Sequence, residues 1–282
     1  MVNSHVHLIP EDTDEYVDAL IARMGEHDIR ASVLFGSQCE QCAGDEEVRN
    51  AVARYPDRFI PFLTRSLDIE DERSLQICLS ELDSGFWQGV GEIFLDCSDD
   101  QYVRWTDREG KERVAVKPVP EHKEEHPLYK GIFEFCGKKK LPVLVHCMDA
   151  TVMARSLEKF KATTFIWAHV DHGFYRDVGI ELMREYPNLY CEFGVEFRFK
   201  SRKLLSGQGK PLLLDHIDRW RRTCREFPNR VIWGTDLYTW NDLCRERFAE
   251  AMRAWAKVTE DFDPELKQAV TEQNILRLLN MA

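Results

Sequence analysis

The sequence predicts an α/β fold, a (β/α)8 barrel of the TIM type, from the number, order and composition of its apolar segments. Eight short β-rich segments alternate with amphipathic helical segments along the 282 residues, which is the element count of such a barrel. The β-rich segments are apolar and β-branched without strict alternation, as expected where both faces of a parallel sheet are buried. No Gly-x-Gly-x-x-Gly motif follows any of them, so an open dinucleotide-binding sheet is the less favoured alternative.

The expected strands are short apolar runs between polar or turn-forming residues. Gly89, for example, precedes the fourth strand, and polar residues follow it. The eight strands are expected at residues 2–8, 30–36, 59–64, 90–95, 141–146, 163–169, 188–195 and 230–235.

Amphipathic helical periods fill the intervals between these strands. Pro56 ends the second helix, because proline does not continue a helix. Helices are expected at residues 13–27, 45–55, 68–83, 127–139, 150–161, 175–186 and 212–227, with two more at 242–258 and 264–279. The last is an extra C-terminal helix, and we expect residues 1–282 to form one domain.

One segment interrupts the alternation. Residues 98–126, between the fourth strand and its helix, are strongly charged and alternate in character on either side of Asp107-Arg108-Glu109-Gly110, as in a β-hairpin. Loops that follow barrel strands open onto the catalytic face, so this insertion is a candidate lid. A solvated surface hairpin is an equal alternative. Tyr102, Arg104 and Trp105 are the candidates for substrate contact if the insertion is a lid.

Charge and composition narrow the functional classes. The formal net charge of −11 argues against a general binder of nucleic acid or of an anionic membrane. No apolar run approaches the roughly 18 residues of a membrane span, and we find no secretory signal. Nine cysteines, an odd number, fit the reduced thiols of a cytoplasmic protein. Cys39-x-x-Cys42 lacks a second Cys or His pair nearby, so a loop is favoured over half a zinc or redox site.

Metal-ligating side chains gather at the carboxyl ends of the expected strands, where barrels hold their active sites. His5 and His7 share one face of the first strand, because alternate residues of a strand point the same way. Imidazoles and carboxylates are common ligands of divalent metals. Four later strands add the candidates Glu92, His146, His169 and Asp236.

Each of these residues also has a structural interpretation. A histidine at a strand end is often a hydrogen-bonded core residue, Glu92 could pair with a buried lysine or arginine, and Asp236 could cap the helix that follows it. Structural histidines have no reason to collect at one end of a barrel, which favours the metal site. His172 is a weaker candidate, and the histidines interpreted as non-functional are His27, His122, His126 and His216.

Such a ligand set predicts hydrolytic chemistry. A divalent metal held by imidazoles and a carboxylate keeps a position open for water, and zinc can lower the pKa of that water to about 7. A carboxylate on the eighth strand, Asp236, is the expected general base. A histidine beside the metal can donate to a developing oxyanion. Zinc is the first expectation, and manganese or iron would fit the same ligands.

With these residues, the sequence resembles the amidohydrolase superfamily of metal-dependent (β/α)8 hydrolases. The short sequence motifs around these residues resemble those of its amidohydrolase-2 branch, and the resemblance covers the chain except the insertion at 98–126. The motifs on which this resemblance rests are Tyr55-Pro56-Asp57-Arg58-Phe59, Ala168-His169 with Gly173 close behind, Asn188-Leu189-Tyr190, Gly234-Thr235-Asp236 and the terminal Gln273-Asn274-Ile275-Leu276-Arg277-Leu278-Leu279.

The resemblance implies site residues position by position. Asp236 would be both a metal ligand and the general base, and His169 would be either a ligand to a second metal or a catalytic acid/base and oxyanion donor. The other ligands would be His5, His7 and His146. Asn3 stands where the family usually has Asp before His-x-His. A side chain that would support the metal ligands from behind is therefore an amide here instead of a carboxylate.

Glu92 leaves the number of metal ions open. Val90-Gly91-Glu92-Ile93, together with the strand at 141–146, resembles the TatD-type nucleases, in which a Glu at this position helps hold two metals. The amidohydrolase-2 branch more often works with one. Glu92 is therefore a candidate ligand of a binuclear site.

Three reactions fit the resemblance. The first is metal-dependent hydrolysis of a small ester, lactone, amide or phosphoester, and the expected partner is therefore a small-molecule substrate. The second is non-oxidative decarboxylation, for which a basic cluster would anchor a carboxylate: Arg198, Lys200, Arg202 and Lys203. The third, a TatD-like phosphodiesterase, is favoured by Glu92 and opposed by the acidic chain. A homo-oligomer stays open, because three aromatic residues could line a subunit contact instead of the favoured core, namely Trp240, Phe248 and Trp255.

Overall fold

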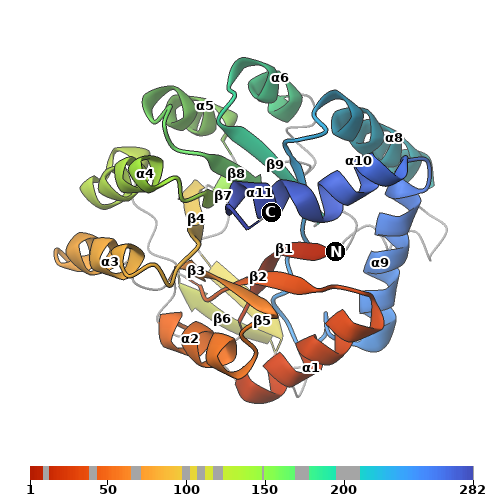
Figure 1. The fold of residues 1–282 in the computed structure, drawn as a ribbon, viewed down its shortest axis with the longest axis horizontal. Coiled ribbons are helices and arrows are strands. Elements are labelled where there is room, and N and C mark those ends of the chain that lie inside the picture. Colours follow the sequence, from red (N-terminus) through yellow and green to blue (C-terminus); the bar gives the residue numbers. More distant parts are fainter. Residues whose placement is uncertain are drawn as a thin grey trace.

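Eight parallel strands form a nearly closed barrel surrounded by helices in the computed structural model of the protein (Figure 1). The structure describes residues 1–8, 13–37, 43–64, 71–96, 102–106, 112–116, 123–147, 149–168, 178–194 and 210–281. Only the backbone is described at 96, 102–106, 112–116, 123 and 210–216. The predicted (β/α)8 fold class is confirmed.

The barrel strands lie side by side in the order of the sequence, and each neighbouring pair is parallel. A parallel bridge between Val6 and Leu237 joins the first strand to the chain that follows the last. The strands are β1 (Val2–His7), β2 (Ala31–Phe35), β3 (Phe59–Leu63), β4 (Gly89–Asp96), β7 (Val143–Cys147), β8 (Phe165–Ala168), β9 (Leu189–Phe193) and β10 (Val231–Trp233).

Helices lie around the barrel, as predicted, but the C-terminal ones differ in detail. The helix expected at 264–279 is divided by a π-helical turn, η2 (Ala269–Gln273). The helical elements are α1 (Thr13–Glu26), α2 (Asp45–Arg54), α3 (Ser74–Asp83), η1 (Lys123–Glu125), α4 (Pro127–Lys139), α5 (Ala150–Lys159), α6 (Val178–Glu185), α8 (Lys210–Glu226), α9 (Arg245–Thr259), α10 (Pro264–Gln268) and α11 (Asn274–Leu278).

The start of α9 differs from its predicted start at residue 242. Asp242 lies in a turn before the helix, where its carboxylate accepts a hydrogen bond from Thr239 Oγ1 at 2.8 Å. The Asp242 backbone N–H donates in turn to Thr239 Oγ1 at 3.2 Å. Asp and Thr side chains compete with helical hydrogen bonding in this way, so the helix begins three residues later, at Arg245.

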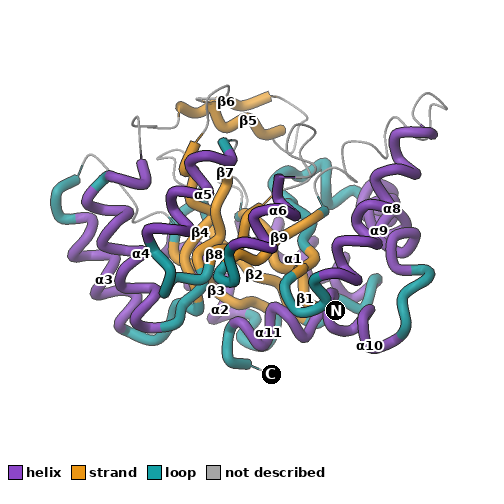
Figure 2. The backbone as a smooth tube through the Cα atoms, turned by 90° about the horizontal axis from the view of Figure 1, so that it is seen from above, coloured by secondary structure: helices purple, strands orange, loops and turns teal. Residues whose placement is uncertain are grey.

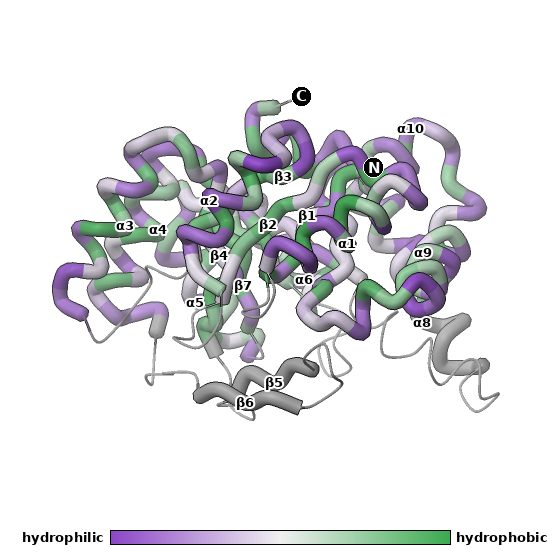
Figure 3. The backbone as a smooth tube through the Cα atoms, turned by 90° about the horizontal axis from the view of Figure 1, so that it is seen from below, coloured by the Kyte–Doolittle hydropathy of each residue, from purple (hydrophilic) through white to green (hydrophobic). Residues whose placement is uncertain are grey.

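Apolar side chains fill two layers, one inside the barrel and one between the strands and the helices. Central strands such as β2 consist mainly of hydrophobic residues, whereas much of α10 is hydrophilic (Figure 3). Val33 and Phe35 face the interior and Leu34 faces the helices, which is the alternation expected of a barrel strand. At one end of the barrel, α11 and the residue after it complete the interior core with Ile275, Leu276 and Leu279. This end is therefore plugged by side chains.

The opposite end carries the insertion. Its two strands, β5 (Tyr102–Thr106) and β6 (Glu112–Val116), pair antiparallel. They lie above the barrel on the side away from α11 and both termini (Figure 2). The proposed turn at 107–110 lies outside the described residues, and so do the side chains of Tyr102, Arg104 and Trp105. The function of the insertion as a lid stays a prediction.

Two of the aromatic residues weighed as a subunit contact belong to the core. Phe248 and Trp255 are buried, and Trp240 packs partly buried against the same core, with its ring 5.5 Å from that of Tyr16. Separately, none of the described helices is long and apolar enough to cross a membrane.

Asn274 joins the plugged end of the barrel to β10. Its buried amide Nδ2 donates to the carbonyl oxygens of Pro228 and Val231, both at 2.8 Å. We expect Asn274→Ala to lower the free energy of unfolding by roughly 2 kcal/mol, because two carbonyl groups lose their donor. Urea denaturation measures this change. The exposed Asn50→Ala in α2 is the control and should stay within about 0.5 kcal/mol of the parent. An equally small change in Asn274→Ala would contradict the prediction.

Candidate metal centre

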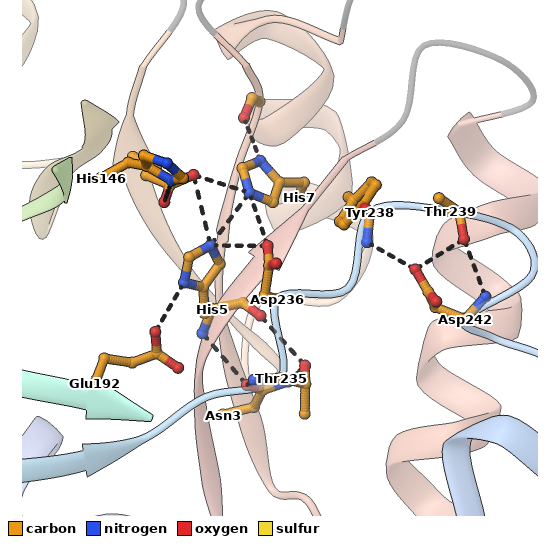
Figure 4. Close-up of polar contacts among 12 residues, drawn as sticks. Asn3, His5, His7, His146, Glu192, Thr235, Asp236, Tyr238, Thr239 and Asp242 are labelled. Carbon is orange, nitrogen blue, oxygen red and sulfur yellow. Dashed lines mark hydrogen bonds and ion pairs between the residues drawn. The ribbon is translucent and has the colours of Figure 1, made fainter. Parts of the chain in front are cut away.

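The imidazoles of His5 and His7 meet at the end of the barrel opposite α11. Both side chains come from one face of β1, and their Nε2 atoms lie 3.2 Å apart. The ring of Phe35 packs against both, with centroid distances of 5.2 and 4.6 Å. This apolar contact fixes the ring planes, and Figure 4 shows the two imidazoles directed at a common point.

The outer nitrogen of each imidazole has its own acceptor. His5 Nδ1 lies 3.3 Å from Glu192 Oε2, and His7 Nδ1 lies 3.2 Å from the carbonyl oxygen of Gly36. A carboxylate and a carbonyl oxygen only accept hydrogen bonds, so each Nδ1 carries the proton and donates it. In its neutral form each ring therefore presents the unprotonated Nε2 to the centre, which is the tautomer that binds a metal through Nε2.

Two carboxylates approach these Nε2 atoms. Asp236 Oδ1 lies 3.3 Å from His5 Nε2 and 3.4 Å from His7 Nε2. Glu92 Oε2 lies 3.3 Å from His7 Nε2 and 3.8 Å from His5 Nε2. Both carboxylates are buried. Within the described part of the chain, the basic groups that face them are imidazoles rather than lysine or arginine.

Asp236 reaches the centre through its backbone conformation. It follows β10 in the left-handed region, at φ 48°, which Asp tolerates better than most residues. The alternative that Asp236 caps the next helix is wrong, because α9 begins at Arg245 with Cys244 at its N-cap. Its carboxylate instead points at the imidazoles (Figure 4).

His146 lies at the edge of the centre and joins it through Glu92. Its Nδ1 is 3.2 Å from Glu92 Oε1, whereas Glu92 Oε2 faces His5 and His7. The Glu92 carboxylate thus spans from the imidazole pair to His146. His169 and His172 lie outside the described residues.

The donor atoms have separations that suit one divalent ion. Zinc binds nitrogen and oxygen ligands at about 2.0–2.2 Å in tetrahedral geometry, so two ligands of one ion lie roughly 3.3–3.6 Å apart. The separations given above among the imidazole Nε2 and carboxylate oxygen atoms run from 3.2 to 3.8 Å. His5, His7 and Glu92 each offer a donor atom within 4.8 Å of the other two. The residues present therefore fit a metal.

Asn3 supports the centre from β1. Its Oδ1 accepts from the backbone N–H groups of Thr235 at 3.0 Å and His5 at 3.3 Å, and its Nδ2 donates to Thr235 Oγ1 at 2.7 Å. A carboxylate could not supply the donor. The departure from the family's usual Asp thus goes with a side chain that uses both polar atoms to hold β1 against the chain after β10.

Two further residues at the centre were not predicted from the sequence. Glu192 is fully buried behind His5, and a charged residue within an apolar strand was the available signal. Tyr238 presents its ring edge-on to His7, with centroids 6.4 Å apart. A lone aromatic residue in a loop gave no signal.

The other polar motifs do not join the centre in the described residues. His27 stacks on Phe248 at 5.2 Å, and His126 caps α4 by accepting from the Leu128 backbone N–H at 3.3 Å. Cys39, Cys42 and His122 lie outside the described residues, as does the side chain of His216.

Comparison with known protein families finds one family model that covers most of the chain. A family model described as Amidohydrolase matches residues 45–281, which begin after the strand that carries His5 and His7. No curated protein matches the chain.

Solved structures share the fold at low sequence identity. A zinc-bound amidohydrolase from Burkholderia multivorans has a TM-score of 0.67 and 13% identity, over 100% of this chain and 99% of that one. A probable 2-pyrone-4,6-dicarboxylic acid hydrolase from Acinetobacter baumannii, with citric acid bound, has a TM-score of 0.62 and 15% identity, over 99% and 98%. A TatD homologue from Escherichia coli has a TM-score of 0.64 and 15% identity, over 100% and 98%. At such identities the likeness shows the fold alone.

Metal and proton compete for His7. Burial lowers the pKa of His7, but hydrogen bonds to Asp236 and Glu92 and the charges of both carboxylates outweigh burial and raise it to about 9. In the metal-free protein at neutral pH, an incoming ion must displace this proton. We therefore expect the apparent Kd for zinc to fall about tenfold for each pH unit gained between about pH 6 and pH 8.

Competition with a chromophoric chelator, corrected for the chelator's own protonation, measures this dependence. The control His27→Ala should keep the same slope, because that ring lies away from the centre. A Kd that does not change over this pH range would contradict the prediction.

Proposed function

The chain belongs to the amidohydrolase family, and from that premise we propose that it is a metal-dependent hydrolase of a small ester, lactone, amide or phosphoester. One observation carries the proposal: the Nε2 atoms of His5 and His7 converge with the carboxylates of Asp236 and Glu92, and these separations suit a single ion. Scaffolds of this kind host many reactions, so the substrate class rests on the chemistry of the centre.

The proposed ligands are His5, His7 and Asp236, with Glu92 between them and His146. A bound divalent ion would polarise the substrate's carbonyl or phosphoryl oxygen and lower the pKa of a water molecule. Zinc is the first choice for mixed nitrogen and oxygen donors, and manganese or iron are alternatives. Because one oxygen of Glu92 faces the imidazole pair and the other faces His146, a second ion beside His146 is a further part of the proposal.

Asp236 is the proposed general base. Its Oδ1 lies beside both imidazoles and its carboxylate is largely screened from solvent. In this role it takes a proton from the attacking water and later gives that proton to the leaving group, so that its own charge is restored. His169 stays proposed either as a ligand to a second metal ion or as a catalytic acid/base and oxyanion donor.

The two alternative reactions gain less support. The basic residues that would anchor a carboxylate for decarboxylation, Arg198, Lys200, Arg202 and Lys203, lie outside the described residues. Glu92 does reach the imidazole pair, as a TatD-like phosphodiesterase would need, but the net charge of −11 disfavours a nucleic-acid substrate. A small-molecule substrate therefore remains the proposal.

Metal content tests the proposal. We expect protein purified without chelator or His-tag to hold one or two equivalents of transition metal by plasma mass spectrometry, and His5→Ala to lose it, because one imidazole of the pair is removed. If the ligands hold two ions, Glu92→Ala should reduce two equivalents to one. His27→Ala is the matched histidine control and should keep the parent's content.

Hydrolysis is assayed in parallel on a lactone, a p-nitrophenyl ester, an anilide and a p-nitrophenyl phosphodiester, with carbon dioxide release measured on aromatic carboxylates. Activity on at least one hydrolytic substrate should disappear with chelator and return with zinc or manganese. A protein that holds no metal and takes up neither ion would refute the proposed function. Carbon dioxide release without hydrolysis would replace it by decarboxylation.

A further inference from the structure

We propose that Glu192 in β9 is a positioning residue that sets the tautomer and direction of His5, and that Gly234 is glycine because a side chain there would displace the Glu192 carboxylate. The inference deepens the proposed function and rests on it, since it concerns how the protein prepares one metal ligand.

Glu192 and His5 form a pair closed to solvent. Both side chains are fully buried, and Glu192 Oε2 lies 3.3 Å from His5 Nδ1. The carboxylate is on the side of the ring away from the centre, whereas Nε2 faces His7 and Asp236 (Figure 4). Glu192 therefore acts on the centre through His5 rather than as a ligand.

The charge of Glu192 decides which tautomer His5 adopts. A carboxylate beside Nδ1 stabilises the Nδ1–H form and leaves the Nε2 lone pair directed at the centre. The other tautomer would point an Nε2–H at the ion and would leave Nδ1 facing an anion without a proton between them. The buried negative charge also strengthens the imidazole as a donor to a cation.

The backbone around Glu192 is shaped for its carboxylate. A Cβ at Gly234 would collide with Glu192 Oε1 and would lie 2.8 Å from Ser4 Oγ. Ser4 Oγ cannot easily withdraw, because it donates to the carbonyl oxygen of Trp233 at 2.9 Å. A Cβ at Gly194 would in turn collide with the carbonyl oxygen of Gly234. The two glycines thus let β9 and the chain after β10 approach closely enough for the carboxylate to reach β1.

The first arm of the test is Glu192→Gln, which keeps the shape of the side chain and removes its charge. The glutamine amide can donate to Nδ1 and favour the wrong tautomer. We expect the Kd for zinc, measured with zinc alone against a chromophoric chelator, to rise tenfold to hundredfold. Gly234→Ala should raise the Kd in the same direction, because it moves the carboxylate without altering its chemistry.

The matched control is Glu124→Gln. Glu124 is also a buried carboxylate, but it pairs with Arg155 at 2.7 Å, away from the centre. This variant should lose stability and keep the parent's zinc Kd. Thermal unfolding of each variant, with and without zinc, separates weaker folding from weaker binding. The Tm without zinc reports the stability of the fold, and the rise in Tm at a fixed zinc concentration grows with the affinity of the folded state for zinc.

A second readout already tests the inference on the parent protein. Nitrogen-15 NMR of the histidine rings in the metal-free parent should show the neutral form of His5 protonated at Nδ1, and in Glu192→Gln the proton should shift toward Nε2. A parent with its His5 proton on Nε2 would overturn the inference even if the variants failed to fold. So would a folded Glu192→Gln with the parent's zinc Kd. If the parent itself bound neither zinc nor manganese, the proposed function would fail, and the tautomer measurement would still decide the part played by Glu192.

Discussion

The closure of the barrel between β1 and the chain after β10 is the constraint on which the centre depends. The backbone N–H of His7 donates to the carbonyl oxygen of Leu237 at 2.8 Å, and Asn3 holds Thr235 with both of its polar atoms. These contacts place Asp236 beside two imidazoles that are more than two hundred residues away in the sequence. Without closure, each side chain would be an ordinary polar residue at the end of a strand.

Closure also gathers negative charge where water is excluded. Asp236, Glu92 and Glu192 are buried around His5 and His7. Burying carboxylates away from water is costly unless they are paired. Protons relieve part of this cost, as the pKa of about 9 for His7 shows. A divalent cation bound by these side chains would relieve more of this cost.

Much of this arrangement could be predicted from the sequence because barrel geometry carries the inference. Once eight strands are counted, the rule that strand ends share one face brings His5, His7, Glu92 and Asp236 together. This rule predicts which end of the barrel a side chain occupies, but it does not predict which other side chains it contacts. Glu192 was missed because a single carboxylate within an apolar strand does not identify the residue that it contacts, here His5 on β1. The structural role of Asn3 depends on a contact across 232 positions.

Local propensity was the weaker guide to the C-terminal helices. Asp242 matches the composition of a helix start, yet its side chain is used in a turn with Thr239. The amphipathic pattern over 264–279 correctly predicts helical structure. It does not predict that Asn274, next to the π-helical turn, donates hydrogen bonds to the carbonyl oxygens of Pro228 and Val231. In both places, particular tertiary contacts override a pattern that the neighbouring residues favour.

The contact between Val6 and Leu237 has a consequence for how the protein is made. This bridge joins two positions that lie far apart in the sequence, and a pairing of that kind incurs the entropy of loop closure before it contributes stability. During synthesis, His5 and His7 emerge long before Asp236 exists, so a nascent chain displays the two imidazoles without the carboxylate that completes their site. Under the proposed function, metal retention would therefore report that the barrel has closed between β1 and the chain after β10.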